Sequence, residues 1–463
     1  MTIQTANDMF DDIDPATGAI IAQIPVAGPE EVFQAVRRAR AAQPAWGALS
    51  FDERASRLTR ATERLGASAR DLGAIITREM GKPFEEACAE VAGAAGTGPR
   101  VLDEVRQALE PTVYATDGNE TRVERHPLGV VAAITPWNFP ALMPIEIVLP
   151  ALAAGNTVVF KPSEHVPLAG AALAECFQQE LPENVLVTIQ GPGSTGAELV
   201  AAEVDMIGFV GSRETGKRIM QSASSGLKRL VLELGGKDPL VVFADADLEA
   251  AADCVVKHAL RNTGQVCCSV ERVYVADSVA TRFEELVLER AKEWKHGNGF
   301  EEGVRMGPLV SRAQRAKVEA QVIDAVAEGA RLLLGGTTPG GDGFFYPATV
   351  LADVTEDLTI SRDETFGPVI SLSRFNGEED EAVRLANDTP YGLGANVFTR
   401  DVERGRRVAG RIQSGQVGVN RYLSASPSAP WVGARQSGFG FIGSIDGHRQ
   451  FTIPKSISYP TGG

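Results

Sequence analysis

From Val130 onward, short apolar runs rich in β-branched residues alternate with longer segments of helical pattern. Strands that alternate with helices predict βαβ units around a parallel sheet. Two such series follow one another, before and after about residue 236, and helical patterns at 29–46 and up to Gly81 precede them. The sequence therefore predicts an α/β fold with two successive sheet domains. The runs include VVAAI at 130–134, TVVF at 157–160, MIGFV at 206–210, RVYVA at 272–276 and VISLS at 369–373.

Charge and apolar patterning exclude two classes of partner. A formal charge of -15 argues against a nucleic-acid or anionic-membrane surface, because phosphate groups would be repelled. Residues 129–160 are apolar enough to suggest a membrane span, but four prolines interrupt them and Asn138 and Glu146 lie inside. We interpret this stretch as buried core. The N-terminus has neither a positive leader nor an apolar segment, so we expect a cytoplasmic protein.

The chain has five cysteines, two of them adjacent in RNTGQVCCSVER at 261–272. The odd number and the absence of a C-x-x-C spacing fit a reducing compartment better than a disulfide framework. No histidine or further cysteine lies at ligand spacing, so no metal site is expected. The residues alone leave three interpretations of the pair: buried thiols, a disulfide, or a nucleophile with a neighbouring thiol. The other three are Cys88, Cys176 and Cys254.

Two glycine patterns could contact a dinucleotide. GPGSTG at 191–196 matches G-x-G-x-x-G between a predicted strand and a predicted helix. FVGSRETG at 209–216 has two glycines and could place a pyrophosphate on a helix N-terminus. Either pattern could instead be an ordinary tight turn, so the patterns alone do not choose between them.

Polar residues at predicted strand ends are candidates for chemistry. Glu164 in VVFKPSE could accept ribose hydroxyls, beside Lys161. Glu233 in LELGGK ends an apolar strand, where burial would raise its pKa toward that of a general base. Asn138 stands between two prolines in TPWNFP, a rigid turn suited to aim an amide at an oxyanion. Each of them could also have a purely structural role.

Six of these motifs together resemble the aldehyde dehydrogenase superfamily. PWNFP, KPSE, FVGS, LELGGK, GQVC and ETFGP occur in this order, followed by NDTPYGL and RQSGFG. The resemblance implies NAD(P)-dependent oxidation of an aldehyde, with Cys267 as nucleophile, Asn138 as oxyanion donor and Glu233 as base. It also implies a Rossmann-like cofactor domain, an α/β catalytic domain and a small β arm for oligomerisation.

The same resemblance assigns the cofactor contacts and the boundaries of the domains. It places the pyrophosphate at FVGS, and makes GPGSTG a wall near the adenine. The cofactor domain is expected at 1–110 and 126–235, the catalytic domain at 236–433, and the arm of a homodimer or homotetramer at 111–125 and 446–460. PWVG and Arg435 depart from the family's usual P-F-G-G and K-x-S-G. The implied cofactor-binding residues are Pro136, Trp137, Lys161, Ser163, Glu164, Gly211, Ser212, Leu234, Gly235, Glu364 and Phe366.

The cofactor and substrate preferences remain expectations with stated alternatives. Glu164 would repel a 2'-phosphate, so NAD is expected, although Lys161 and Ser163 could accommodate NADP. The chain is similar in length to bacterial succinate-semialdehyde dehydrogenases, which commonly carry Arg six residues after the second Pro of PWNFP, where this chain has Glu146.

The predicted tunnel, with Met143 and Glu146, should therefore favour neutral or amino-bearing aldehydes. Succinate semialdehyde, anchored by Arg421 or Arg435, is the alternative substrate. A thiol esterase or acyl transferase that uses the same cysteine is the alternative class of enzyme.

Overall fold

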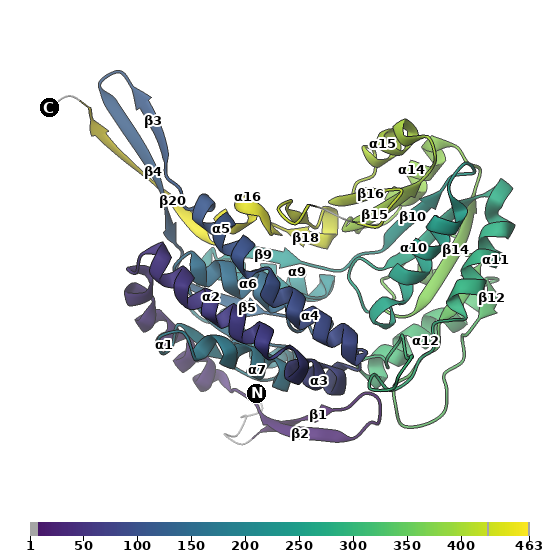
Figure 1. Ribbon diagram of the computed structural model, residues 1–463, viewed down its shortest axis with the longest axis horizontal. Helices are drawn as coiled ribbons and strands as arrows, with labels where there is room; N and C mark the ends of the chain where they lie inside the picture. The colour runs from purple at the N-terminus through teal and green to yellow at the C-terminus, as the bar shows by residue number, and fades with distance from the viewer. Residues whose placement is uncertain (1–7, 424–425, 462–463) are drawn as a thin grey trace.

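The computed structural model describes residues 8–423 and 426–461, which form two sheet-centred halves and a projecting arm (Figure 1). The first half contains a six-stranded sheet in the order β18-β9-β8-β5-β6-β7, parallel except for β18. Its strands are β5 Val130–Ile134, β6 Thr157–Lys161, β7 Leu186–Thr188, β8 Met206–Val210, β9 Arg229–Glu233 and β18 Gly438–Phe439.

Alternate side chains of the first sheet enter two apolar layers. Val130 and Ala132 pack with α1, α8 and α9, whereas Val131 and Ala133 pack with α2, α6 and α7. Burial on both faces explains why these strands are continuously apolar in sequence. The helices of this half are α1 Pro29–Gly47, α2 Phe51–Ala67, α3 Ala69–Met80, α4 Phe84–Gly96, α5 Gly98–Ala108, α6 Leu142–Ala153, α7 Pro167–Gln178, α8 Gly193–Ala201 and α9 Arg213–Ala223.

The second half contains a seven-stranded sheet in the order β12-β13-β14-β11-β10-β15-β16, in which only β12 runs antiparallel to its neighbour. Helices α10 and α11 cover one face, and α14 and α15 the other. The strands are β10 Asp238–Val242, β11 Val270–Ala276, β12 Arg331–Leu334, β13 Thr349–Ala352, β14 Val369–Phe375, β15 Gly394–Phe398 and β16 Gln416–Val419. The helices are α10 Leu248–Leu260, α11 Ala280–Ala291, α12 Arg312–Ala327, α13 Thr359–Arg362, α14 Glu379–Asn387 and α15 Val402–Ala409.

The second half is inserted between two neighbouring strands of the first. The chain leaves the first sheet at the end of β9 and returns in β18, where Gly438 pairs with Glu233. The remaining elements are β1 Met9–Ile13, β2 Ile20–Pro25, β17 Trp431–Val432, β19 Phe441–Ile442, α16 Ser444–Arg449, and the 3₁₀ turns η1 Ser224–Gly226, η2 Arg261–Gly264, η3 Asp277–Val279 and η4 Arg435–Ser437.

The arm is a three-stranded antiparallel sheet that extends away from both halves (Figure 1). It consists of β3 Thr112–Thr116, β4 Asn119–Pro127 and β20 Thr452–Pro460. Residues 446–449, which the sequence placed with the arm, lie in α16 against α5. Several large apolar side chains of the arm are exposed to solvent, among them Val113, Tyr114, Ile453 and Ile457.

The prediction of an α/β fold with parallel sheets is confirmed. The apolar stretch 129–160 forms β5, the following loop, α6 and β6, all largely buried within the first half. Strand β13 and the hairpin β1–β2 were not predicted. Strand β1, MFDDI, carries two acidic residues. Strand β2, IIAQIP, is apolar in sequence, but only Ile24 of it is buried, so its pattern does not follow the burial that reveals a core strand. Among the described residues, no helix is long and apolar enough to cross a membrane.

Candidate active site

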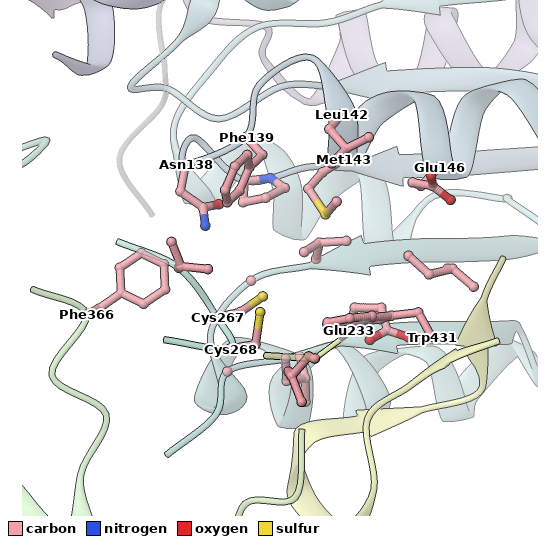
Figure 2. A pocket seen from close by; sticks show the side chains of 18 of the residues that line it. Asn138, Phe139, Leu142, Met143, Glu146, Glu233, Cys267, Cys268, Phe366 and Trp431 are labelled. Carbon is pink, nitrogen blue, oxygen red and sulfur yellow. The ribbon is translucent and has the colours of Figure 1, made fainter. Parts of the chain in front are cut away.

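A cavity of about 690 Å³ lies between the two halves, where the carboxyl ends of several parallel strands meet (Figure 2). Its walls come from the loops after β5, β8 and β9, from residues 261–268 and from residues 364–366. Ligands of open α/β sheets bind beyond the carboxyl ends of the strands, so this is the expected place for a site. The sequence-predicted residues that line it are Pro136, Trp137, Asn138, Met143, Glu146, Gly211, Ser212, Glu233, Leu234, Gly235, Cys267, Glu364 and Phe366.

Three of the predicted residues lie outside this cavity. Lys161 ends β6, the neighbour of β5 in the first sheet, and Ser163 and Glu164 follow it. The Glu164 carboxylate lies 3.8 Å from the Lys161 ammonium and 3.4 Å from the Ser163 hydroxyl. Next to them, the ring of His165 stands edge-on to Trp137, with ring centroids 6.2 Å apart. The three residues therefore continue the same sheet edge beyond the cavity.

A left-handed turn brings the cysteine pair into the cavity. Asn262, Thr263 and Gly264 all have positive φ, with values of 52°, 58° and 69°. A side chain at Gly264 would clash with the carbonyl oxygen of Gly367, so only glycine fits there. Positive φ is costly for a β-branched residue such as Thr263, and such strain is concentrated at functional sites. The turn ends α10 sharply and places Cys267 at the cavity wall.

The two thiols interact directly with each other. Cys267 is partly exposed and Cys268 is buried, and Tyr422 Oη lies 3.1 Å from Cys268 Sγ and 2.7 Å from its carbonyl oxygen. The hydrogen bond to Cys268, together with burial, raises the pKa of Cys267. The same hydrogen bond, helped by Tyr422, lowers the pKa of Cys268. In the protein without substrate, negative charge is therefore favoured on Cys268 over Cys267.

Glu233 is a buried carboxyl group without a partner. Its side chain ends β9 and is 4% exposed, and neither carboxyl oxygen has a hydrogen-bond partner among the described residues. Burial raises its pKa well above the ordinary carboxyl range, since nothing compensates the loss of water. Once the pH is high enough to ionise it, such a carboxylate can accept a proton from a water molecule. Glu233 lines the same cavity as Trp431 and the two cysteines, all of which Figure 2 labels.

Asn138 is held by a buried network that sequence reasoning missed. Its backbone carbonyl accepts hydrogen bonds from Lys82 Nζ at 2.9 Å and Asn262 Nδ2 at 3.0 Å, and its amide Nδ2 donates to the Gln265 carbonyl at 3.0 Å. One N–H of the amide remains for a ligand. Glu90 pairs with Lys82 and accepts from the backbone N–H groups of residues 141 and 142.

Nothing in the sequence revealed Lys82, because it stands beside a helix stop in MGKP, where a lysine is usually solvated. In the structure its side chain is completely buried. Only the packing of α4 against α6 turns this loop residue into a support for the Asn138 turn.

The opposite side of the cavity fits a dinucleotide. Ser212 caps α9, and this helix of eleven residues presents its N-terminus at the wall, where backbone N–H groups favour a phosphate. Gly235 has no side chain because Glu364 occupies that space, and the Gly236 N–H donates to Glu364 at 3.1 Å. Burial raises the pKa of Glu364 to about 7. Phe366 has a φ of 55° and stands edge-on to Trp137, with ring centroids 5.4 Å apart.

The remaining end of the cavity is lined by α5, α6 and the segment after Tyr422. Met143 and Glu146 are three residues apart on α6 and therefore lie on one face. Arg100 of α5 and Trp431 line the same end. Arg435 is not in the wall and donates to the carbonyl oxygens of Asn387 and Tyr391, and Arg421 is not in the wall either. Neither arginine supports the suggested anion anchor.

Comparison with known proteins agrees with this geometry. The model of the "Aldehyde dehydrogenase family" matches residues 2–457. A probable succinate-semialdehyde dehydrogenase [NADP(+)] from Sinorhizobium fredii is 40% identical, over 97% of this chain and 92% of the relative. A betaine aldehyde dehydrogenase from Brucella melitensis is also 40% identical, over 96% and 92%.

The crystal structure of a betaine aldehyde dehydrogenase from Staphylococcus aureus in complex with NAD+ superposes with a TM-score of 0.94 at 32% identity, covering 98% of this chain and 92% of that one. The family match spans nearly the whole chain, and both relatives are 40% identical to it over almost their full length. This chain therefore belongs to the aldehyde dehydrogenase family.

Proposed function

We propose that this protein, an NAD(P)-dependent aldehyde dehydrogenase, oxidises its substrate through a covalent bond to Cys267. The observation that supports this most directly is the meeting of Asn138, Cys267 and Glu233 in one cavity that continues to the N-terminus of α9. The Cys267 thiolate attacks the aldehyde carbon, and the free N–H of the Asn138 amide and the Cys267 backbone N–H hold the resulting oxyanion. A thiohemiacetal forms on the enzyme.

Glu233 is assigned to the second half of the reaction. NAD, when bound, would supply the hydride acceptor, and loss of the hydride from the thiohemiacetal would leave a thioester on Cys267. Glu233 removes a proton from a water molecule, and this water attacks the thioester carbon to release the acid and restore the thiol. Gly211 and Ser212 would hold the pyrophosphate, and Glu364 and Phe366 would hold the nicotinamide end.

Formation of NADH separates this function from that of a thiol esterase or acyl transferase. A panel of aldehydes with NAD should give growth of absorbance at the reduced-nicotinamide band. Both activities use the same thiol, so ester hydrolysis alone does not separate them. Hydrolysis of an activated ester, with no NADH formed from any aldehyde, would favour the esterase.

NAD is expected to be preferred over NADP. A 2'-phosphate near Glu164 would meet like charge, and a repulsion of roughly 1.4 kcal/mol gives about a tenfold ratio of kcat/KM. Replacement of Glu164 by Gln should narrow that ratio, measured with one aldehyde and both cofactors. Glu183→Gln, an exposed change in the same half, is the matched control. A wild-type protein that prefers NADP would contradict the proposal.

Lys82 is expected to act on the rate through the position of Asn138. Lys82→Met should lower kcat roughly 100-fold with little change in KM, since a displacement of about 1 Å in a catalytic group has that effect. It also leaves Glu90 buried without its cationic partner, which destabilises by about 3–5 kcal/mol.

The double variant Lys82→Met/Glu90→Gln separates the two effects. It should recover much of the lost thermal stability while kcat remains low. A double variant with the kcat of the wild type would show that Lys82 acts only on stability.

The relatives do not decide the substrate, because proteins named for a semialdehyde and for betaine aldehyde are equally similar to this chain. Glu146 occupies the wall where an anionic tail would need a cation, so we infer that succinate semialdehyde is a poor substrate. Glu146→Arg should shift the ratio of kcat/KM toward it. A preference of the wild type for succinate semialdehyde over neutral aldehydes of the same length would reject this inference.

We also propose a cytoplasmic homodimer or homotetramer, and the arm supports the oligomeric part of this proposal. Its exposed apolar side chains and its free strand edges are features that pairing with another copy would cover. Sedimentation of the purified protein tests this part of the proposal.

A further inference from the structure

Glu146 is a carboxyl group of the cavity wall that has no direct partner among the described residues of the cavity. Its side chain lines the wall, yet it forms no direct hydrogen bond or ion pair among residues 8–423 and 426–461. Desolvation raises its pKa, and Arg100 only partly offsets this. A carboxylate in such a place is costly unless a ligand compensates it.

The two arginines of the cavity are already paired with other carboxylates. Arg100 Nη1 lies 2.9 Å from Glu104 Oε2. Arg261 Nε lies 3.0 Å from Glu86 Oε1. Lys317 lines the cofactor side, where it acts on the charge of Glu364. The pairing of each arginine with its own carboxylate leaves Glu146 as the unbalanced charge of the substrate end.

His448 does not supply the missing charge. Its Nε2 lies 3.1 Å from the same Glu104 oxygen, and burial lowers its pKa, so it is neutral at pH 7. When Glu146 is ionised, the group formed by Arg100, Glu104, His448 and Glu146 therefore holds one more negative charge than positive charge.

The position of Glu146 suits the far end of a substrate. Figure 2 shows Asn138, Met143 and Glu146 in this order along one wall, with the cysteines nearer Asn138 than Glu146. From Leu142 to Glu146 the helix rises about 6 Å. A substrate whose carbonyl is held at Asn138 would thus extend several carbons before its tail meets the carboxylate.

We infer that Glu146 forms a subsite for a positively charged tail, so that the physiological substrate is an aldehyde bearing a protonated amine or a quaternary ammonium group. This inference rests on the proposed function and narrows it from neutral or amino-bearing aldehydes to cationic ones. An ammonium group would supply the donors that Glu146 lacks, and a quaternary ammonium would supply charge alone.

Two pairs of isosteric aldehydes test the subsite. The first pair is 3-aminopropanal and butanal, and the second is 4-trimethylammoniobutanal and 5,5-dimethylhexanal. The cation should be favoured in kcat/KM by about tenfold or more in at least one pair, the range expected for a charge-assisted contact. A larger ratio in the first pair identifies the amine, and a larger ratio in the second identifies the quaternary group.

Glu146→Gln should bring these ratios close to one, because the amide keeps the shape and removes the charge. Glu110→Gln removes the same charge from an exposed position outside the cavity and should leave the ratios as in the wild type. Equal use of cationic and neutral members of both pairs, or a Glu146→Gln protein with unchanged ratios, would overturn the inference.

A binding measurement keeps the subsite testable without turnover. Butyltrimethylammonium and butylammonium chlorides should raise the melting temperature of the wild type more than that of Glu146→Gln, at equal ionic strength. If no aldehyde is oxidised but these salts still bind in a Glu146-dependent manner, the proposed function fails and the subsite stands. If aldehydes are oxidised and neither salt discriminates the two proteins, the subsite fails alone.

Discussion

Cys267→Ala is expected to abolish aldehyde oxidation, with kcat at least about 1000-fold lower, whereas Cys268→Ser should retain most of it. Loss of the attacking sulfur removes the covalent route entirely. Serine at 268 keeps a hydroxyl that can accept from the Cys267 thiol and interact with Tyr422. NADH formation at saturating aldehyde, with melting temperatures as a check of folding, measures both variants.

The electrostatics of the pair make this comparison informative. The pKa of Cys268 is lowered and that of Cys267 is raised. Before substrate binds, Cys268, which is more buried and contacts Tyr422, is therefore the more easily ionised of the two. If Cys268→Ser loses as much activity as Cys267→Ala and both fold, the assignment of the reaction to Cys267 alone is wrong. Loss in Cys268→Ser with activity retained in Cys267→Ala would make Cys268 the nucleophile. Ester hydrolysis without cofactor should follow the same residue as aldehyde oxidation.

Glu233→Gln is expected to stop the reaction after the redox step. A glutamine cannot accept a proton from water, so the thioester should accumulate. We expect a burst of NADH that approaches one per active site, followed by turnover about 100- to 10,000-fold slower. Rapid-mixing absorbance measures the burst, and intact-protein mass should increase by the acyl group. A slow phase without any burst would place Glu233 before hydride transfer.

The raised pKa of Glu233 also predicts two pH effects. Since the base must be ionised, wild-type kcat should fall as the pH drops through this raised pKa, and the dependence should be lost in Glu233→Gln. Its neutral form is favoured in the folded state, so its stabilising contribution is complete below the ordinary carboxyl pKa and is lost as pH rises through the raised one. Glu233→Gln should therefore gain stability relative to wild type at pH 8 more than at pH 4, measured by thermal unfolding.

The sequence predicted the parallel sheets well because their strands are buried on both faces. VVAAI and MIGFV are continuous apolar runs, and they form β5 and β8 with the same bounds. The hairpin β1–β2 was missed, because β1 is partly acidic and the apolar residues of β2 are mostly not buried. Its strands depend on pairing with each other and on tertiary contacts, which local patterns do not record.

The residues of the candidate site were predicted from motifs, but their supports were not. Gly235 was named as a cofactor contact, whereas its need for glycine comes from Glu364, a residue more than one hundred positions away in the chain. The unpaired state of Glu233 and the pairing of Arg100 with Glu104 are likewise visible only once distant elements pack. A single sequence gives the kind of residue at each position, and the structure adds which partners it has or lacks.

The insertion of the second half between β9 and β18 has a consequence for folding during synthesis. The segment from about 234 to 437 leaves and re-enters the first sheet at paired positions, so its ends are close together and it can form its own core as a unit. The first sheet, in contrast, waits for Gly438 and Phe439 to cover the open edge of β9. A ribosome-bound chain that has not reached these residues exposes the backbone edge of β9, a strand that contains the apolar residues Val231 and Leu232. The early half of this protein is thus the one that most needs protection from aggregation while the later half is still being made.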